Sequence, residues 1–114
     1  MMLDLRRAGV TDVGVLEALE VTPREMFLAG PFKGRAFEDV ALPIGYHQTV
    51  SQPTVVGRMT QALEVTDRMK VLEVGTGSGY QAAVLAQLCR RLYTIERHPA
   101  LLKEAEDRLN RLGL

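Results

Sequence analysis

The stretch Met69-Lys-Val-Leu-Glu-Val-Gly-Thr-Gly-Ser-Gly-Tyr80 decides the fold of this chain. Its apolar run, Val71 to Val74, stops at glycines on alternate positions, Gly75, Gly77 and Gly79, and a helical pattern follows at once. We expect a buried parallel strand that turns through these glycines into a helix. Such a turn brings free backbone N–H groups and a helix N-terminus together. Open α/β sheets bind ligands at this end of their strands.

The spacing of the glycines narrows the class of ligand. A dinucleotide turn needs glycine at its first, third and sixth positions, but the sixth position here is Tyr80. No Gly-Lys-Ser/Thr follows, which excludes a P-loop. Glu73 precedes Gly75 by two residues, where its carboxylate would repel a pyrophosphate and suit a ligand with an ammonium group. A glycine-rich turn without a ligand stays open as an alternative.

The pattern Glu73-x-Gly75-x-Gly77-x-Gly79 resembles the first motif of S-adenosylmethionine-dependent methyltransferases with a Rossmann-like core. The resemblance implies S-adenosylmethionine as cofactor, with contacts from Glu73, Gly75, Thr76, Gly77, Ser78 and Gly79. Glu96 supports this interpretation, because it follows an apolar run and lies 21 residues after Gly75. Nucleotide-binding βαβ units place an acid at this distance to accept hydrogen bonds from ribose hydroxyls. Alternatively, Glu96 only caps the helix that begins near Pro99.

Composition excludes several other classes. The formal net charge is zero and the isoelectric point is about 6.7, so bulk charge does not indicate a nucleic-acid-binding surface. No apolar run approaches the ~20 residues that a membrane span needs, and the start lacks a signal-peptide layout. We therefore expect a cytoplasmic protein. Cys89, His47 and His98 show no ligand spacing, so we expect no metal.

Two segments follow one another along the chain, 1–68 and 69–114. The first is expected to be helical and irregular. It begins with a helix capped by Thr11, whose apolar face carries Val13, Leu16 and Leu19, and continues with a capping box at Thr22–Glu25 and an extended stretch over Ala36–Leu42. A further helix is expected from Gln52 to Leu63, with Val55, Val56, Met59 and Leu63 on one side. The second is expected to be strand, helix, strand, helix, over Met69–Val74, Tyr80–Leu88, Leu92–Ile95 and Pro99–Leu112.

Residues 42–53 are rich in turn formers and small hydroxyl residues, and we expect a flexible loop. The sequence Ile44-Gly-Tyr-His-Gln-Thr-Val-Ser-Gln-Pro53 closely resembles the Ile-Gly-x-x-Gln-Thr-Ile/Val-Ser-x-Pro loop of protein-L-isoaspartate O-methyltransferases. Thr22-Pro-Arg-Glu-Met-Phe27 and the glycine turn extend the resemblance over nearly the whole chain. His47 departs from it, since many bacterial members have glycine there.

The resemblance implies a reaction and roles for loop residues. The family transfers a methyl group from S-adenosylmethionine to the α-carboxylate of L-isoaspartyl residues in damaged proteins, which are the expected partners. Ser51 matches the serine to which the family assigns a catalytic role, and Gln48 and Thr49 are expected to line the cofactor and substrate cavity. Alternatively, Ser51 only helps to cap the following helix.

The resemblance implies an α/β, Rossmann-like methyltransferase fold that is incomplete, with the first two strands of a mostly parallel sheet after an N-terminal helical segment. We therefore expect the chain to be the N-terminal half of a longer enzyme, with weak cofactor binding and little turnover alone. The first strand should leave apolar surface bare. A different methyltransferase of the same cofactor class, or a non-catalytic binding module, stays open. The sequence leaves the oligomeric state undetermined.

Overall fold

Residues 69–114 form two parallel strands connected by a helix. In the computed structural model, which describes all of residues 1–114, β3 (Lys70–Val74) turns into α4 (Tyr80–Ala86), and β4 (Arg91–Ile95) leads into α5 (Pro99–Arg111). The parallel register pairs Lys70 with Arg91 and Val74 with Ile95. These four elements confirm the predicted order, and their bounds differ by one or two residues from those expected.

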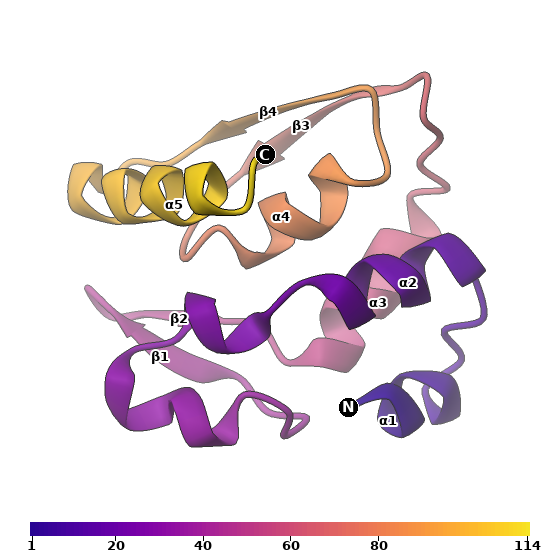
Figure 1. The fold of residues 1–114 in the computed structure, drawn as a ribbon, viewed down its shortest axis with the longest axis horizontal. Helices are drawn as coiled ribbons and strands as arrows, with labels where there is room; N and C mark the ends of the chain where they lie inside the picture. The colour runs from indigo at the N-terminus through magenta and orange to yellow at the C-terminus, as the bar shows by residue number, and fades with distance from the viewer.

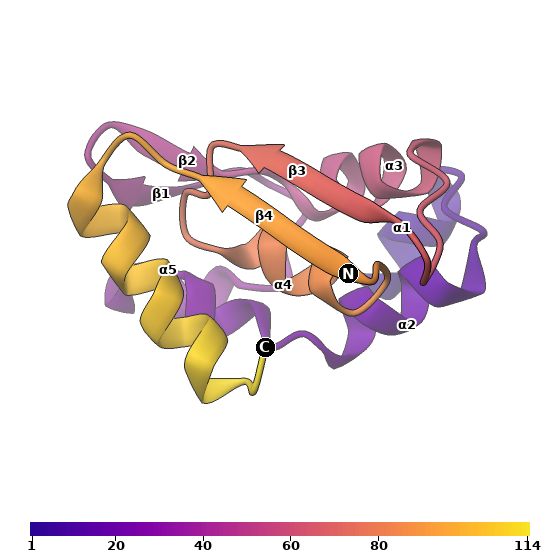
Figure 2. The same cartoon turned by 90° about the horizontal axis from the view of Figure 1, so that it is seen from above.

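One face of this two-stranded sheet packs against the protein and the other is bare. α4 lies beneath the sheet and is almost entirely buried, whereas nothing covers the opposite face (Figures 1 and 2). Strand residues alternate between the faces, so the bare face presents large apolar side chains: Leu72, Val74, Tyr93 and Ile95. The expected bare apolar surface is therefore present, and the expected full burial of the first strand is wrong.

Residues 1–68 form the other layer of the molecule. Its elements are α1 (Met2–Arg7), α2 (Val13–Val21), the 3₁₀ helices η1 (Arg24–Phe27) and η2 (Gly30–Arg35), the strands β1 (Leu42–Gly45) and β2 (Gln48–Val50), and α3 (Pro53–Ala62). Figure 1 shows this layer below the β3–β4 sheet. Gly57 lets α3 approach the segment 5–10 closely, because a Cβ there would lie 2.7 Å from the Leu5 side chain.

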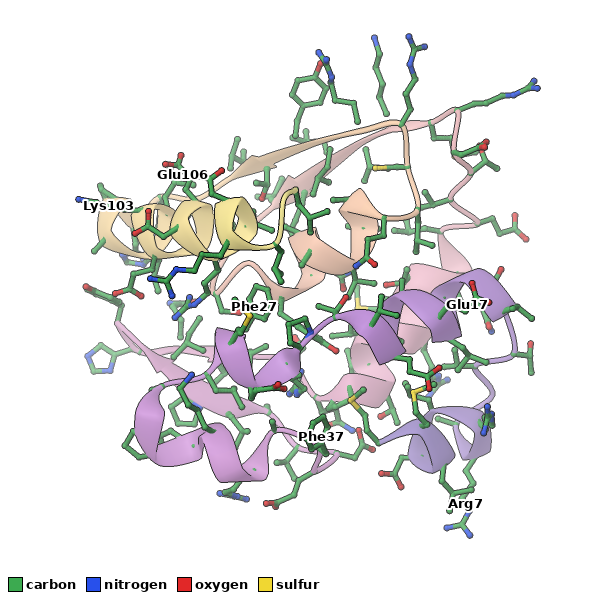
Figure 3. The ribbon with its side chains drawn as sticks, viewed as in Figure 1. Arg7, Glu17, Phe27, Phe37, Lys103 and Glu106 are labelled. Carbon is green, nitrogen blue, oxygen red and sulfur yellow. The ribbon has the colours of Figure 1, made fainter.

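A single core joins the two segments. It contains Leu5, Val10 and Leu19 from the first segment and Tyr80, Ala83 and Val84 from α4. Phe27 lies in this interior, edge-on to the Tyr80 ring at 5.6 Å, whereas Arg7, Glu17, Lys103 and Glu106 point outward (Figure 3). The division into a segment 1–68 and a cofactor segment 69–114 stays a prediction about function.

The local predictions for residues 11–27 are partly wrong. Asp12, not Thr11, caps α2, because its carboxylate accepts the hydrogen bond from the Val15 N–H. No capping box forms at Thr22–Glu25, since the Thr22 hydroxyl donates back to the Ala18 carbonyl and the following turn is a 3₁₀ helix. Arg24, the first residue of this 3₁₀ helix, is buried.

Two further predictions between residues 36 and 63 are wrong in part. Turns occupy residues 36–41, and the extended structure begins only at Leu42. α3 confirms the predicted helix, but of the residues expected on its apolar side only Val56 is buried, together with Thr54, Gly57 and Thr60. Met59 and Leu63 are exposed because close packing against α1 selects the face with glycine.

Candidate functional site

All three glycines of the turn between β3 and α4 adopt left-handed backbone conformations. Their φ angles are 93° at Gly75, 55° at Gly77 and 93° at Gly79. Residues with a Cβ rarely adopt these angles, so the alternating glycines are required for the chain to turn this tightly. Gly79 additionally lies against α5, where a Cβ would come within 3.1 Å of Ala105.

The backbone N–H groups of this turn are mostly engaged within the protein. The N–H groups of Gly75 and Thr76 both donate to the Ile95 carbonyl, at 2.8 and 3.2 Å. The Gly77 N–H donates to Glu96 Oε1 at 2.9 Å. The expectation of several free N–H donors is therefore wrong, because the end of β4 takes them. The same bonds fix the turn against β4, and the space beside Gly75 stays open, since a Cβ there would meet nothing within 4 Å.

Glu96 joins the turn to the start of α5. Besides Gly77, its carboxylate accepts a hydrogen bond from the His98 N–H at 3.0 Å. These backbone donors lower the pKa of Glu96, so it carries its charge at neutral pH. His98 is the N-cap residue of α5, and both interpretations made from the sequence therefore remain compatible: Glu96 supports the helix start and keeps further lone pairs for a ligand.

Glu73 lies in a chain of hydroxyl groups on the covered face of the sheet. The parallel register places it beside Thr94, whose hydroxyl donates to Glu73 Oε1 at 2.7 Å. The Thr94 hydroxyl oxygen is also 2.6 Å from the Thr76 hydroxyl oxygen. Burial raises the pKa of Glu73, the hydrogen bond from Thr94 opposes that rise, and nearby Glu96 adds to it. A cation bound here would gain from this partly desolvated carboxylate.

A cavity of about 370 Å³ brings most of the predicted residues together. The hairpin end, α3, β3 and the glycine turn contribute its walls, and the predicted residues among them are Thr49, Ser51, Glu73, Gly75, Thr76, Gly77 and Ser78. Met59, Leu63 and Val71 give it an apolar side. This volume lies in the range of small-molecule sites, and segments twenty or more residues apart in the sequence meet in it.

A second cavity of about 470 Å³ adjoins the first through Val74 and Gly75, which line both. It contains two of the remaining three predicted residues, Gln48 and Glu96, together with His98. Gly79 is the one predicted residue that lines neither cavity. Its position against α5 is structural, and a ligand contact there stays a prediction.

The predicted flexible loop contains an antiparallel hairpin. β1 and β2 pair Leu42 with Val50 and Pro43 with Thr49. The two residues at the tip, Tyr46 and His47, both adopt left-handed conformations, with φ angles of 54° and 58°. The Tyr46 ring stacks on the His98 ring, with centroids 6.2 Å apart. The hairpin tip therefore contacts His98, which lies two residues after Glu96.

Two residues that hold site residues in place, Thr94 and Arg24, were not predicted from the sequence. Thr94 binds Glu73, and Arg24 binds the backbone carbonyl of Ser51 at 3.1 Å. The strand alternation of residues 91–95 places Thr94 on the same face as Leu92, and pairing in parallel register with β3 could have indicated its contact with Glu73. No sequence pattern predicted the role of Arg24, since its contacts come from three separate segments, at Val40, Ser51 and Tyr80.

No group of three or more His, Cys, Asp or Glu side chains is placed to hold a metal ion. None of the helices combines the length and apolar character that crossing a bilayer would require.

A glycine turn between a parallel strand and a helix, with carboxylates at the ends of both strands, defines a Rossmann-like α/β protein with a small-molecule site. The family model for protein-L-isoaspartate(D-aspartate) O-methyltransferase matches residues 1–114, and the chain belongs to this family.

Curated relatives and solved structures agree with this family. The chain is 62% identical to the protein-L-isoaspartate O-methyltransferase of Rhodospirillum rubrum over 114 residues, which cover all of this chain and 52% of that protein. It is 63% identical to the enzyme of the same name from Paramagnetospirillum magneticum, covering 53% of it. The chain thus spans about half the length of the curated relatives it matches.

Two solved structures share the fold. A protein-L-isoaspartate O-methyltransferase superposes with a TM-score of 0.85 at 28% identity, covering 99% of this chain and 38% of that one. A Plasmodium falciparum protein described as a protein-L-isoaspartate O-methyltransferase, in complex with S-adenosyl-L-homocysteine, superposes with a TM-score of 0.80. Its identity is 19% over 96% of this chain and 53% of that one, so this second likeness concerns the fold alone.

Proposed function

We propose that this chain carries the cofactor turn and the substrate loop of a protein-L-isoaspartate O-methyltransferase. In a protein of the relatives' length, it would transfer the methyl group of S-adenosylmethionine to the α-carboxylate of L-isoaspartyl residues in damaged proteins. The observation that carries the proposal is the shared cavity: Thr49 and Ser51 of the hairpin segment line the same space as Glu73 and the glycine turn. We place the reaction in the cytoplasm, on protein substrates and without nucleic acid.

The two carboxylates suit two polar parts of the cofactor, its ribose and the ammonium group of its methionine part. Glu96 remains charged and accessible beside the second cavity, where it can accept hydrogen bonds from ribose hydroxyls. Glu73 lines the first cavity, where its carboxylate can attract the ammonium group of the methionine part. Val74 and Gly75 line both spaces, so one extended molecule can run from Glu96 to Glu73 across the glycine turn.

The chemistry requires alignment more than proton transfer. A carboxylate oxygen attacks the methyl carbon, the bond from that carbon to sulfur breaks, and the sulfur keeps the electron pair as a neutral thioether. The attacking carboxylate is already ionised at neutral pH, so no general base is needed. Opposite charges vanish as the methyl group moves, and a strongly charged surrounding would favour the reactants. Neutral groups that hold the reactants in line can supply most of the rate.

Ser51 is the proposed catalytic residue because its position meets this requirement. It is exposed on the cavity wall, directly after β2, and its hydroxyl is neutral and can donate a hydrogen bond to the substrate carboxylate. Thr49 lines the same wall, and Gln48 lines the adjoining cavity. Both are proposed to contact the cofactor or hold the substrate backbone.

A peptide methylation assay tests the proposal. Because the chain covers about half of its relatives, the assay uses a chimaera in which residues 1–114 replace the matching half of the Paramagnetospirillum magneticum relative. The two substrates are an isoaspartyl peptide and its twin with a normal aspartyl linkage. We expect labelled methyl ester on the isoaspartyl peptide and none above background on the twin. Equal methylation of both peptides would point to another methyltransferase of the same cofactor class, and a folded chimaera that methylates neither would reject the proposal.

A further inference from the structure

Arg24 in η1 is a buried charge outside the cavities described above. Its side chain is fully buried, with 0% of its surface exposed. Burial lowers the pKa of Arg24, because the guanidinium is removed from water. Arginine is among the residues that proteins bury least often, and a buried charge requires compensating contacts.

The contacts of Arg24 compensate for only part of this cost. Its Nη2 donates to the Ser51 carbonyl at 3.1 Å and to the Val40 carbonyl at 3.4 Å. The guanidinium carbon lies 4.8 Å from the centre of the Tyr80 ring. Nε and Nη1 are buried and have no hydrogen-bond partner. An apolar side chain of similar volume would avoid the cost of these unpaired donors, so stability alone does not account for Arg24.

The contacts of Arg24 join the two walls of the first cavity. Ser51 follows β2 on the hairpin side, and Tyr80 is the first residue of α4, directly after Gly79. A second anchor lies three residues after Ser51, where the Asp39 carboxylate accepts hydrogen bonds from both the N–H and the hydroxyl of Thr54, each at 3.0 Å. Asp39 also stabilises the charge of Arg24 electrostatically. The segment 51–54 is therefore held at both ends, by Arg24 at Ser51 and by Asp39 at Thr54.

We propose that Arg24 is a positioning residue for Ser51. By holding the Ser51 carbonyl while lying against Tyr80, it sets the orientation of the Ser51 side chain relative to the glycine turn. Arg24 touches neither substrate nor cofactor in this arrangement, because it is fully buried. The proposal rests on the proposed function, since it assigns Arg24 to the methyl-transfer step.

Arg24→Lys in the chimaera tests the proposal, because lysine keeps the charge but cannot reproduce the planar guanidinium over Tyr80 with its fixed donors. We expect kcat on the isoaspartyl peptide to fall about ten- to hundredfold, the range for one lost charge-assisted hydrogen bond. The Kd for S-adenosylhomocysteine should change by less than about threefold. Val10→Ala, a core variant remote from the cavities, serves as the control for lost stability. A kcat loss no larger than that of this control at the same fraction folded would overturn the proposal.

A double variant distinguishes action through Ser51 from action elsewhere. If Arg24 works by orienting Ser51, Arg24→Lys should slow a Ser51→Ala chimaera by less than about twofold. Multiplication of the two separate losses would instead show that Arg24 acts independently of Ser51, and would overturn the proposal.

A measurement on the unaltered chimaera is independent of both activity and variant folding. Nuclear magnetic resonance should give resolved, slowly exchanging Arg24 guanidinium protons with cross-peaks to the Ser51 and Gln52 backbone. Averaged, rapidly exchanging signals without such cross-peaks would overturn the proposal even if every variant failed to fold. If the chimaera methylates no peptide while these signals are present, the proposed function fails but the anchoring of Ser51 stands.

Discussion

The Thr94 hydroxyl donates a hydrogen bond to Glu73 Oε1 at 2.7 Å across the β3–β4 pair. Because the strands are parallel and in register, this contact places a carboxylate at the base of the cavity that contains Ser51 and the glycine turn. Burial still raises the pKa of Glu73 despite that bond. The result is a carboxylate that prefers a cation beside it.

Glu73→Gln in the chimaera should weaken S-adenosylmethionine binding by about tenfold, the loss of one charge-assisted contact in a partly buried site. In the unaltered protein, affinity should rise with pH as Glu73 ionises, and this rise should be absent from the variant. Calorimetry across pH measures both. Glu106→Gln, on the exposed face of α5, is the matched control. Unchanged affinity in Glu73→Gln would exclude the assigned contact.

The same pKa shift predicts how stability depends on pH. The pKa of Glu73 is higher in the folded protein than in the unfolded chain, so the folded state binds the proton more tightly. Its contribution to stability is complete below the unfolded pKa and is lost as pH rises through the folded pKa. Urea unfolding of the ligand-free chimaera should show this loss, and Glu73→Gln should abolish it. A variant that keeps the full pH dependence would show that another group causes it.

Ser51→Ala should lower kcat on the isoaspartyl peptide by about ten- to hundredfold, because the substrate carboxylate loses an orienting hydrogen bond. The Kd for S-adenosylhomocysteine should stay within about twofold. Steady-state kinetics and calorimetry give these two quantities. Thr11→Ala removes an exposed hydroxyl far from the cavities and should leave both unchanged. Turnover at the level of the unaltered chimaera would mean that Ser51 has only a structural role before α3.

His47→Gly should raise the free energy of unfolding by up to about 1 kcal/mol. His47 has a φ of 58°, and the left-handed conformation costs a residue with a Cβ roughly 1–2 kcal/mol, part of which glycine gives back as chain entropy. Gly45→Ala is the converse variant, since Gly45 has a φ of 92°, and it should destabilise. Denaturant unfolding measures both. A His47→Gly variant that unfolds at lower denaturant would show that the His47 side chain contributes more than its strain removes.

Gly57→Ala should destabilise the protein by about 1–3 kcal/mol, the usual cost of overpacking. The added Cβ would lie 2.7 Å from Leu5 Cδ2 and 3.0 Å from Val10 Cγ2. Gly34→Ala is a matched control, since nothing lies within 4 Å of its Cβ position. Thermal or urea unfolding compares the two. Equal stability of both variants would show that α3 can shift away from residues 5–10 without cost.

Local patterns predicted the elements that depend on local chemistry. The alternating glycines predicted the turn, because left-handed conformations leave few other residue types possible at Gly75 and Gly79. The strands and helices after residue 69 followed from apolar runs and periodicity. The hairpin at residues 42–50 was missed because its tip carries Tyr46 and His47. Hairpin turns with two left-handed residues usually contain glycine or asparagine at these positions.

The remaining errors arise where tertiary contacts select among local options. The helical pattern of α3 was found, but its buried face was not, since close approach to Leu5 requires Gly57 rather than Met59 to face inward. The site residues were predicted individually. Their division between two adjoining cavities could not be predicted, because it depends on how the hairpin packs against the β3–β4 sheet. Arg24 and Thr94 were missed because their roles depend on partners 27 and 21 residues away.

The proposed positions of cofactor and substrate can be tested by a crystal structure of the chimaera with S-adenosylhomocysteine and an isoaspartyl peptide. We expect ribose hydroxyls within hydrogen-bond distance of Glu96, the amino group of the cofactor product beside Glu73, and the isoaspartyl α-carboxylate between the Ser51 hydroxyl and the cofactor sulfur. A cofactor product bound away from the glycine turn, or a peptide carboxylate remote from Ser51 while the sulfur faces elsewhere, would contradict it.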